Sequence, residues 1–146
     1  MSLLELQEKQ VIIIENQKYE VLNMTKFREK SSYWIEYKLR NLYSEKFFYL
    51  NVEIQSKAIL YEILENVTIE LKMTINFQNE DYDLYEKGTE KVETYYGITD
   101  IGLNEKAQYY EYVNRNNNRV FLSVEKWDDK TEVSLGKEIT LLDIKY

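Results

Sequence analysis

The feature that most constrains this chain is one segment that is written twice. The first copy spans Tyr33–Glu53 and contains YWIEYKLRN and KFFYLNVE, and the second spans Gln108–Glu125 and contains YYEYVNRN and NRVFLSVE. Both copies alternate apolar and polar residues on the two sides of a turn, which is typical of an antiparallel hairpin with one buried face. The sequence therefore predicts two equivalent β-hairpins.

The alternation also fixes which residues lie opposite each other, because a slip of one residue would exchange the two faces of a strand. One face of each hairpin is apolar and the other is acidic and aromatic. The apolar faces are expected to hold Ile35, Tyr37, Leu50 and Val52 in the first copy and Tyr110, Tyr112, Leu122 and Val124 in the second. The other faces are expected to pair Trp34 with Glu53, Glu36 with Asn51, Tyr109 with Glu125 and Glu111 with Ser123.

We expect the apolar faces to point into the core and the acidic, aromatic faces to point outward. The candidate ligand- or partner-binding residues all lie on the second kind of face: Trp34, Glu36, Glu53, Tyr109, Glu111 and Glu125. Exposed strand faces are usually mixed and polar, so ordinary sheet surface is the simpler interpretation of these residues. Both interpretations stay open at this point.

Composition narrows the class of protein. A chain of 146 residues suits a single domain, residues 1–146, with pseudo-repeat halves at about 11–77 and 80–146. Fourteen tyrosines, five phenylalanines and two tryptophans favour strands over helices. Cysteine and histidine are absent, which excludes disulfides and removes the commonest general base and transition-metal ligand. We therefore expect no metal site and no cofactor.

Charge and hydropathy exclude two further classes. The net charge of −7 opposes binding to a phosphate backbone, so nucleic acid is not an expected partner. The longest aliphatic run, Val11–Ile14, is far too short to cross a bilayer. The N-terminus has acidic residues where a signal peptide would carry basic ones, so a cytoplasmic location is expected.

The rest of the chain reads as further strands. Ser2-Leu3-Leu4-Glu5 fits a capping box and predicts a short N-terminal helix. Strands are expected at Val11–Glu15, Lys18–Phe27, Ala58–Leu64, Val67–Phe77, Glu90–Ile101, Thr131–Leu135 and Ile139–Ile144, with turns at Lys87-Gly88-Thr89 and Gly136. About ten to twelve strands are roughly twice the mean for one sheet. The predicted fold is therefore all-β, an antiparallel sandwich or barrel-like fold with an internal pseudo-twofold repeat.

Several of these motifs resemble a known family. Tyr33-Trp34-Ile35-Glu36-Tyr37-Lys38-Leu39, Phe48-Tyr49-Leu50 and Val124-Glu125-Lys126-Trp127 with Ser134-Leu135-Gly136 are similar to a bacterial family catalogued as domain of unknown function 4178. Its pattern is W-x-E-Y-x-L, then a W/Y-L hairpin, then both again, and the resemblance covers about Val11 to the C-terminus. It implies an all-β domain without an assigned activity. Members of that family are often encoded beside envelope-stress or polyamine-related proteins, so the resemblance points to a partner of that kind, with envelope stress preferred.

No catalytic motif supports an enzyme. A G-x-S-x-G elbow, a phosphate-binding glycine loop and an H-E-x-x-H pair are all missing, and no histidine can activate the serines. The favoured function is a non-enzymatic binding or protein-interaction module, with a homodimer as one possible arrangement. The alternative is a small-ligand binder whose interior, lined by Tyr37, Tyr110 and Tyr112, holds an apolar or cationic guest. A carboxylate-based hydrolase is less favoured than either.

Overall fold

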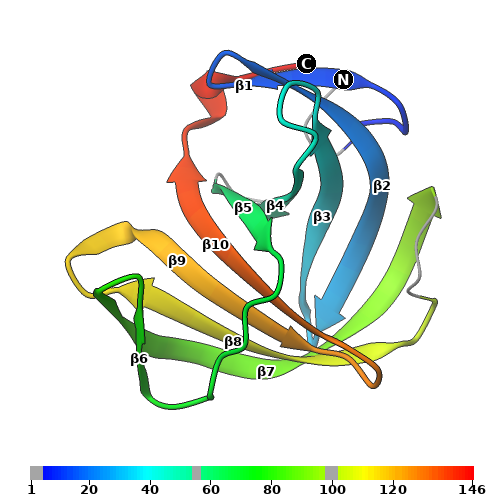
Figure 1. The fold of residues 1–146 in the computed structure, drawn as a ribbon. Helices are drawn as coiled ribbons and strands as arrows, with labels where there is room; N and C mark the ends of the chain where they lie inside the picture. The colour runs from blue at the N-terminus through cyan, green and yellow to red at the C-terminus, as the bar shows by residue number, and fades with distance from the viewer. Residues whose placement is uncertain (1–4, 54–56, 98–101) are drawn as a thin grey trace.

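The computed structural model describes residues 5–53, 57–97 and 102–146 of the chain. The described residues form antiparallel strands and one 3-10 helix, which confirms the all-β class (Figure 1). The elements are β1 (Val11–Ile14), β2 (Gln17–Glu29), β3 (Ser32–Asn41), β4 (Phe47–Glu53), β5 (Ala58–Leu64), β6 (Thr74–Phe77), β7 (Glu80–Gly97), β8 (Lys106–Asn114), β9 (Asn117–Lys126), β10 (Thr131–Ile139), η1 (Leu141–Asp143) and β11 (Ile144–Lys145).

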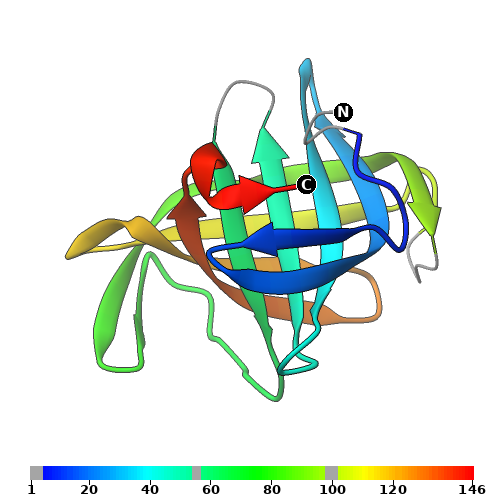
Figure 2. The same cartoon turned by 90° about the horizontal axis from the view of Figure 1, so that it is seen from above.

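A closed barrel forms the body of the molecule. The strands follow the order β11-β1-β2-β3-β4-β5-β10-β9-β8-β7-β6, and an additional pairing of β2 with β7 closes the sheet on itself. The barrel wall therefore consists of β2, β3, β4, β5, β10, β9, β8 and β7 (Figures 1 and 2). Closure removes the exposed edges of an open sheet. An interior of this size can be filled by side chains or can hold one small ligand.

The two halves of the chain use the same order of strand pairings. Strands β1 to β5 pair consecutively, as do β6 to β10, and the halves meet at β5–β10 and β2–β7. Each half opens with a two-residue turn of positive φ, at Glu15-Asn16 in one half and Gln78-Asn79 in the other. Such left-handed turns match the twist of a hairpin. That the two halves form an internal repeat stays a prediction.

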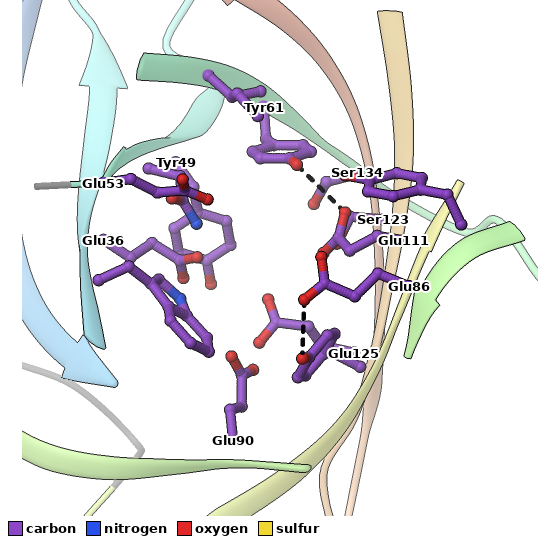
Figure 3. Close-up of a pocket in the computed structure, with 15 residues that line it drawn as sticks. Glu36, Tyr49, Glu53, Tyr61, Glu86, Glu90, Glu111, Ser123, Glu125 and Ser134 are labelled. Carbon is purple, nitrogen blue, oxygen red and sulfur yellow. Dashed lines mark hydrogen bonds between the residues drawn. The ribbon is translucent and has the colours of Figure 1, made fainter. Parts of the chain in front are cut away.

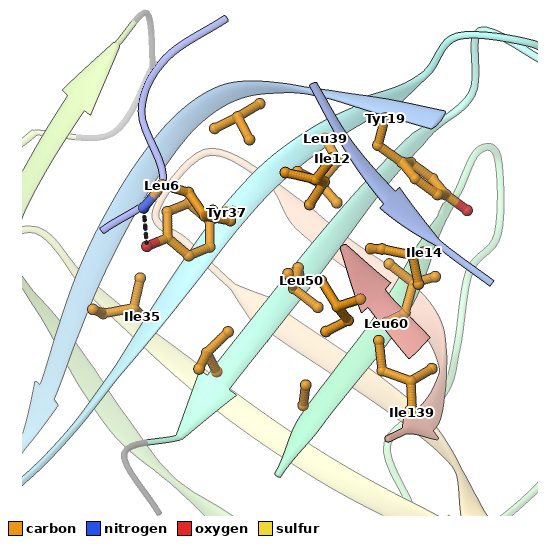
Figure 4. Packing of buried hydrophobic residues seen from close by; sticks show 14 residues of the cluster. Leu6, Ile12, Ile14, Tyr19, Ile35, Tyr37, Leu39, Leu50, Leu60 and Ile139 are labelled. Carbon is orange, nitrogen blue, oxygen red and sulfur yellow. Dashed lines mark hydrogen bonds between the residues drawn. The ribbon is translucent and has the colours of Figure 1, made fainter. Parts of the chain in front are cut away.

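Hydrophobic side chains on the outside of the barrel wall form the main core. In the first half, β1 and β11 lie across the outer face of β3, β4 and β5 (Figure 2). The core there includes Ile12, Ile14, Leu39, Leu50 and Leu60, all buried (Figure 4). Burial of each such side chain contributes roughly 1.5–3 kcal/mol, so this cover is a large part of the stability.

The second half has a matching cover, made by residues 67–77. Its side chains pack against Leu122, Val124 and Val133 on the outer face of β9 and β10. Two tyrosines at equivalent positions hold the two covers in place. The Tyr37 hydroxyl accepts a 3.3 Å hydrogen bond from the backbone N–H of Leu6, and the Tyr112 hydroxyl donates one of 2.9 Å to the carbonyl of Lys72.

Several local expectations need correction or fall on residues outside the described ranges. The expected strand Ile139–Ile144 is instead the end of β10, the 3-10 helix η1 and the start of β11. Only Thr74–Phe77 of the expected strand Val67–Phe77 is strand, because residues 67–73 cover the barrel instead of pairing with it. The expected turn at residues 87–89 is wrong, since β7 runs through it, and β10 likewise continues through Gly136 to Ile139. The expected helix begins outside the described residues, and residues 5–10 contain no helix.

Gly88 and Gly136 lie within strands and do not form turns; each leaves space for an aromatic ring. A Cβ on Gly136 would stand 2.5 Å from the ring of Tyr61, and one on Gly88 would stand 2.8 Å from the hydroxyl oxygen of Tyr109. Both glycines therefore let an aromatic side chain from another strand lie directly on the backbone inside the barrel.

Candidate functional site

Both hairpins have the predicted register, but their faces point the opposite way from the prediction. Glu36 lies opposite Asn51, and Glu111 lies opposite Ser123, as expected. However, Glu36 and Glu125 are each 9% exposed and Tyr109 is 6% exposed. The expectation of outward-facing acidic faces is therefore wrong: they line the inside of the barrel, and the apolar faces form the covered outside.

The physical reason is that alternation separates two faces without showing which one a closed sheet will enclose. The apolar faces are buried all the same, because β1, β11 and residues 67–77 cover them. For the same reason Tyr37 and Tyr112, expected to line an interior, lie instead on the covered outer face. Tyr110 packs with Tyr112 there.

The inside of the barrel, which we call the acidic lumen, holds a cavity of about 80 Å³ (Figure 3). Its acidic lining residues are Glu36, Glu53, Glu86, Glu90, Glu111 and Glu125, and its aromatic ones are Trp34, Tyr49, Tyr61, Tyr85 and Tyr109. Among the described residues that line it, none is lysine or arginine. The lumen therefore concentrates negative charge without a basic counter-charge in its wall.

All six residues proposed from the sequence line this one cavity. The four strands that bring them together come from different halves of the chain: β3 and β4 carry the first hairpin's residues, and β8 and β9 carry the second's. Sequence reasoning missed Tyr61, because AILYEIL shows no clear alternation, and Glu90, because the residues before it read as a turn. Side chains two residues apart in a strand lie on the same face, so Glu86, Gly88 and Glu90 share one face of β7. That spacing is the signal by which Glu90 could have been found.

Glu111 is held at the centre of a hydroxyl network. Its two carboxylate oxygens accept hydrogen bonds from Ser123 Oγ at 2.8 Å and from the Tyr61 hydroxyl at 3.2 Å. These bonds favour the ionised carboxylate, but burial outweighs them and raises the pKa of Glu111 to about 8. Glu111 is therefore a group whose charge changes near neutral pH.

Glu90 and Glu125 form a coupled pair of carboxyl groups joined by a hydrogen bond. Burial, together with the neighbouring acidic groups, raises the pKa of both carboxyls above the ordinary value of a glutamate. Glu90 is 3% exposed, and its Oε1 has no hydrogen-bond partner among the described residues. A buried carboxyl oxygen without a donor is costly, which marks this point of the lumen as unsatisfied.

Two further tyrosines that line the lumen, Tyr109 and Tyr49, donate hydrogen bonds to acidic side chains. The Tyr109 hydroxyl donates hydrogen bonds to Glu29 at 2.6 Å and to Glu86 at 3.2 Å, and its ring meets the edge of Trp34. The Tyr49 hydroxyl donates to both carboxylate oxygens of Glu132, at 3.0 and 3.1 Å. The hydroxyls of three lining tyrosines, Tyr49, Tyr61 and Tyr109, thus donate to acidic groups in or beside the lumen.

Burial also affects Glu36, which faces the other acids from β3. Its pKa lies well above the ordinary value, mainly because of burial and then because of the charge of Glu125. Because burial disfavours the ionised form of these carboxyls, a nearby positive charge would stabilise that form. Among the described residues, no three acidic side chains converge closely enough to hold a metal ion.

A family model described as a domain of unknown function, DUF4178, matches residues 8–141. The chain belongs to the DUF4178 family. The resemblance drawn from the hairpin motifs is thereby confirmed, and in this DUF4178 domain those motifs form the lumen wall. No curated protein and no solved structure matches the chain significantly.

The described part of this DUF4178 domain has no helix that is long and apolar enough to cross a membrane. The cytoplasmic location, the envelope-stress partner and the homodimer stay predictions. The hypothesis of an exposed Trp34–Tyr109 recognition face is wrong, because Tyr109 is buried and both side chains line the lumen.

Proposed function

We propose that this DUF4178 domain binds a small organic cation inside the barrel, and that the cation is a primary ammonium group on a short apolar chain. The observation that carries the proposal is the buried Glu90 Oε1, which lacks a hydrogen-bond donor in a cavity lined by acids. A protonated amine supplies both the missing donor and the missing positive charge.

Charge supports the same class of ligand. Desolvation of an ionised carboxyl is unfavourable unless a cation or donors compensate it. The lumen buries Glu36, Glu90 and Glu125 together, with the partly buried Glu111 beside them. Their pKa values are raised because the surrounding wall supplies too little positive charge and too few donors to offset desolvation. A bound ammonium would lower those values and leave the carboxyls ionised.

The aromatic side chains favour an organic cation over a hydrated inorganic one. Trp34, Tyr49, Tyr61 and Tyr85 contribute ring surface to the cavity. A cation over a ring face gains roughly 0.5–2 kcal/mol, and the attached alkyl chain gains from burial beside the rings. The acids fix the ammonium, and the rings accommodate the carbon chain.

Size limits the guest. Since one water needs roughly 10–15 Å³ of such space, the cavity of about 80 Å³ accommodates several non-hydrogen atoms. The n-propylammonium ion, a four-atom chain, is of suitable size and is a convenient probe. Tetramethylammonium has the same charge but no N–H group, so it cannot satisfy Glu90.

Isothermal titration calorimetry at low ionic strength tests the proposal. We expect saturable binding of n-propylammonium, weaker binding of tetramethylammonium, and none of propionate, which has the same chain and the opposite charge. The double variant Glu90→Gln/Glu125→Gln should lose at least about tenfold in affinity, because two charge-assisted contacts are removed.

The matched control is Glu8→Gln/Glu45→Gln, which makes the same change in net charge at two exposed positions. It should bind as tightly as the unmodified protein. Equal losses in both double variants would attribute binding to overall charge and would contradict a site in the lumen. Absence of saturable n-propylammonium binding to the folded protein would overturn the proposed ligand class.

A further inference from the structure

A second, oppositely charged site lies on the outer surface of the barrel. A groove of about 510 Å³ is lined by five basic side chains, Arg28, Lys30, Lys87, Lys91 and Lys106, and by one acidic residue, Glu29. The groove crosses β2, β7 and β8 and shares no lining residue with the acidic lumen. In a chain of net charge −7, such a concentration of basic residues is unusual.

The register of the strands places three of these basic residues directly opposite one another. Arg28 lies directly opposite Lys91, and Lys91 lies directly opposite Lys106. Three cations thus stand in a row across three adjacent strands. Like charges directly opposite each other destabilise a sheet, so the row carries a cost that an anionic ligand would relieve.

The acids near the groove do not balance this charge. Glu93 pairs with Arg28 at 2.6 Å and lies 3.6 Å from Lys26, and Glu29 accepts the hydrogen bond from Tyr109. Among the described residues, Lys87, Lys91 and Lys106 have no ion pair within 4.0 Å. Three ammonium groups are therefore left for a ligand.

The geometry also limits the kind of anion. Adjacent strands lie about 4.8 Å apart, so the row spans about 10 Å. A phosphate group brings up to two charges and three acceptor oxygens to one point, and lysine binds it well as a point charge. A long polyanion would extend beyond the groove onto the acidic remainder of the surface and be repelled there.

We propose that this groove, formed by Arg28, Lys30, Lys87, Lys91 and Lys106, binds a compact phosphate-bearing ligand. The ligand's charge would take the place of the acidic partners that Lys87, Lys91 and Lys106 lack among the described residues. This site is independent of the lumen, so its test does not depend on the binding of a cation there.

Titration calorimetry with inorganic pyrophosphate at low salt provides the test, with the folding of every variant checked by circular dichroism. We expect saturable binding, and a loss of at least about tenfold in affinity in Lys91→Gln/Lys106→Gln, since two charged contacts disappear. A second arm measures co-sedimentation with phosphatidic acid vesicles, using the same variants. Binding in the first arm indicates a soluble phosphate ligand, and binding in the second alone indicates a lipid headgroup.

The control is Lys18→Gln/Lys145→Gln, which removes the same charge at exposed positions in β2 and β11, away from the groove. It should retain full binding. If the control loses as much affinity as the groove variant, the groove has no specific role. If neither pyrophosphate nor the vesicles bind the folded protein, the proposal is wrong.

Discussion

Tyr61 on β5 donates its hydroxyl to Glu111 on β8, so the lumen is bridged between residues that are 50 positions apart. The ring of Tyr61 reaches this position because it lies on the bare backbone of Gly136. The hydrogen bond to Glu111 on β8 therefore requires both the hydroxyl of Tyr61 on β5 and the absence of a side chain at Gly136 on β10.

Replacing Gly136 with alanine tests that dependence. The new Cβ would stand 2.5 Å from two ring carbons of Tyr61. We expect Gly136→Ala to lower the free energy of unfolding by about 1–3 kcal/mol, the range for overpacked interiors. Urea denaturation measures it. Gly102→Ala is the control, because no atom lies within 4 Å of its added Cβ, and it should change stability little. Equal effects of the two substitutions would argue against the close contact with Tyr61.

The stability of the protein should depend on the charge of Glu111. Its folded-state pKa of about 8 lies above the ordinary value of 4.5, so the folded state binds a proton that the unfolded state has released. Between about pH 4.5 and 8 the free energy of unfolding therefore falls as pH rises. Glu111→Gln should flatten this decline and raise stability at pH 8 relative to the unmodified protein.

Urea denaturation at pH 5 and pH 8 provides the measurement. Glu36, Glu90 and Glu125 contribute with the same sign, because burial raises their pKa values too, so the variant keeps part of the slope. Glu45→Gln, at an exposed turn, should leave the slope unchanged. Parallel curves for Glu111→Gln and the unmodified protein would show that Glu111 titrates normally.

The cover formed by β1 should be as important as the barrel wall. Ile12 is fully buried although β1 lies outside the closed barrel. We expect Ile12→Ala to cost about 2–5 kcal/mol, as for other large-to-small changes in a core. Val11→Ala, at the exposed neighbouring position, should cost far less. A small effect at Ile12 would mean that the barrel is stable without its cover.

Removing one cation from the row on the outer surface should increase stability, whereas Ile12→Ala should decrease it. Lys91 faces a basic residue on both neighbouring strands, Arg28 and Lys106. Lys91→Gln should therefore raise the free energy of unfolding by about 0.2–1 kcal/mol at low salt. The gain should shrink in high salt, where surface charges are screened. Lys18→Gln should give no gain, and a loss of stability in Lys91→Gln would show that the row is not repulsive.

Much of the fold was accessible from the sequence because it depends on local alternation. The hairpin registers, such as Trp34 opposite Glu53, follow from a period of two and from the likeness of the two copies. The direction of the faces was not accessible, because both faces of this wall are buried and alternation does not rank them. The covers themselves come from segments far away in the chain, such as Leu6 over Tyr37.

The candidate site, too, was predictable from the sequence only in part. Its hairpin members were identified because Glu36 and Glu111 recur at equivalent positions. Glu90 was missed because Gly88 suggested a turn, whereas that glycine gives space to Tyr109, a contact known only from the tertiary structure. Sequence patterns thus located the residues but could not show that they enclose a common space.

The placement of the hydrophobic core outside the barrel wall has a consequence for how such domains can diversify. Mutations that resize or recharge the interior leave the contacts of Leu50 and Leu122 with their covers untouched. Selection can therefore act on the guest and on the scaffold through separate sets of positions, one on each side of the same strands. A single framework can in this way acquire new specificities while its folding requirements stay constant.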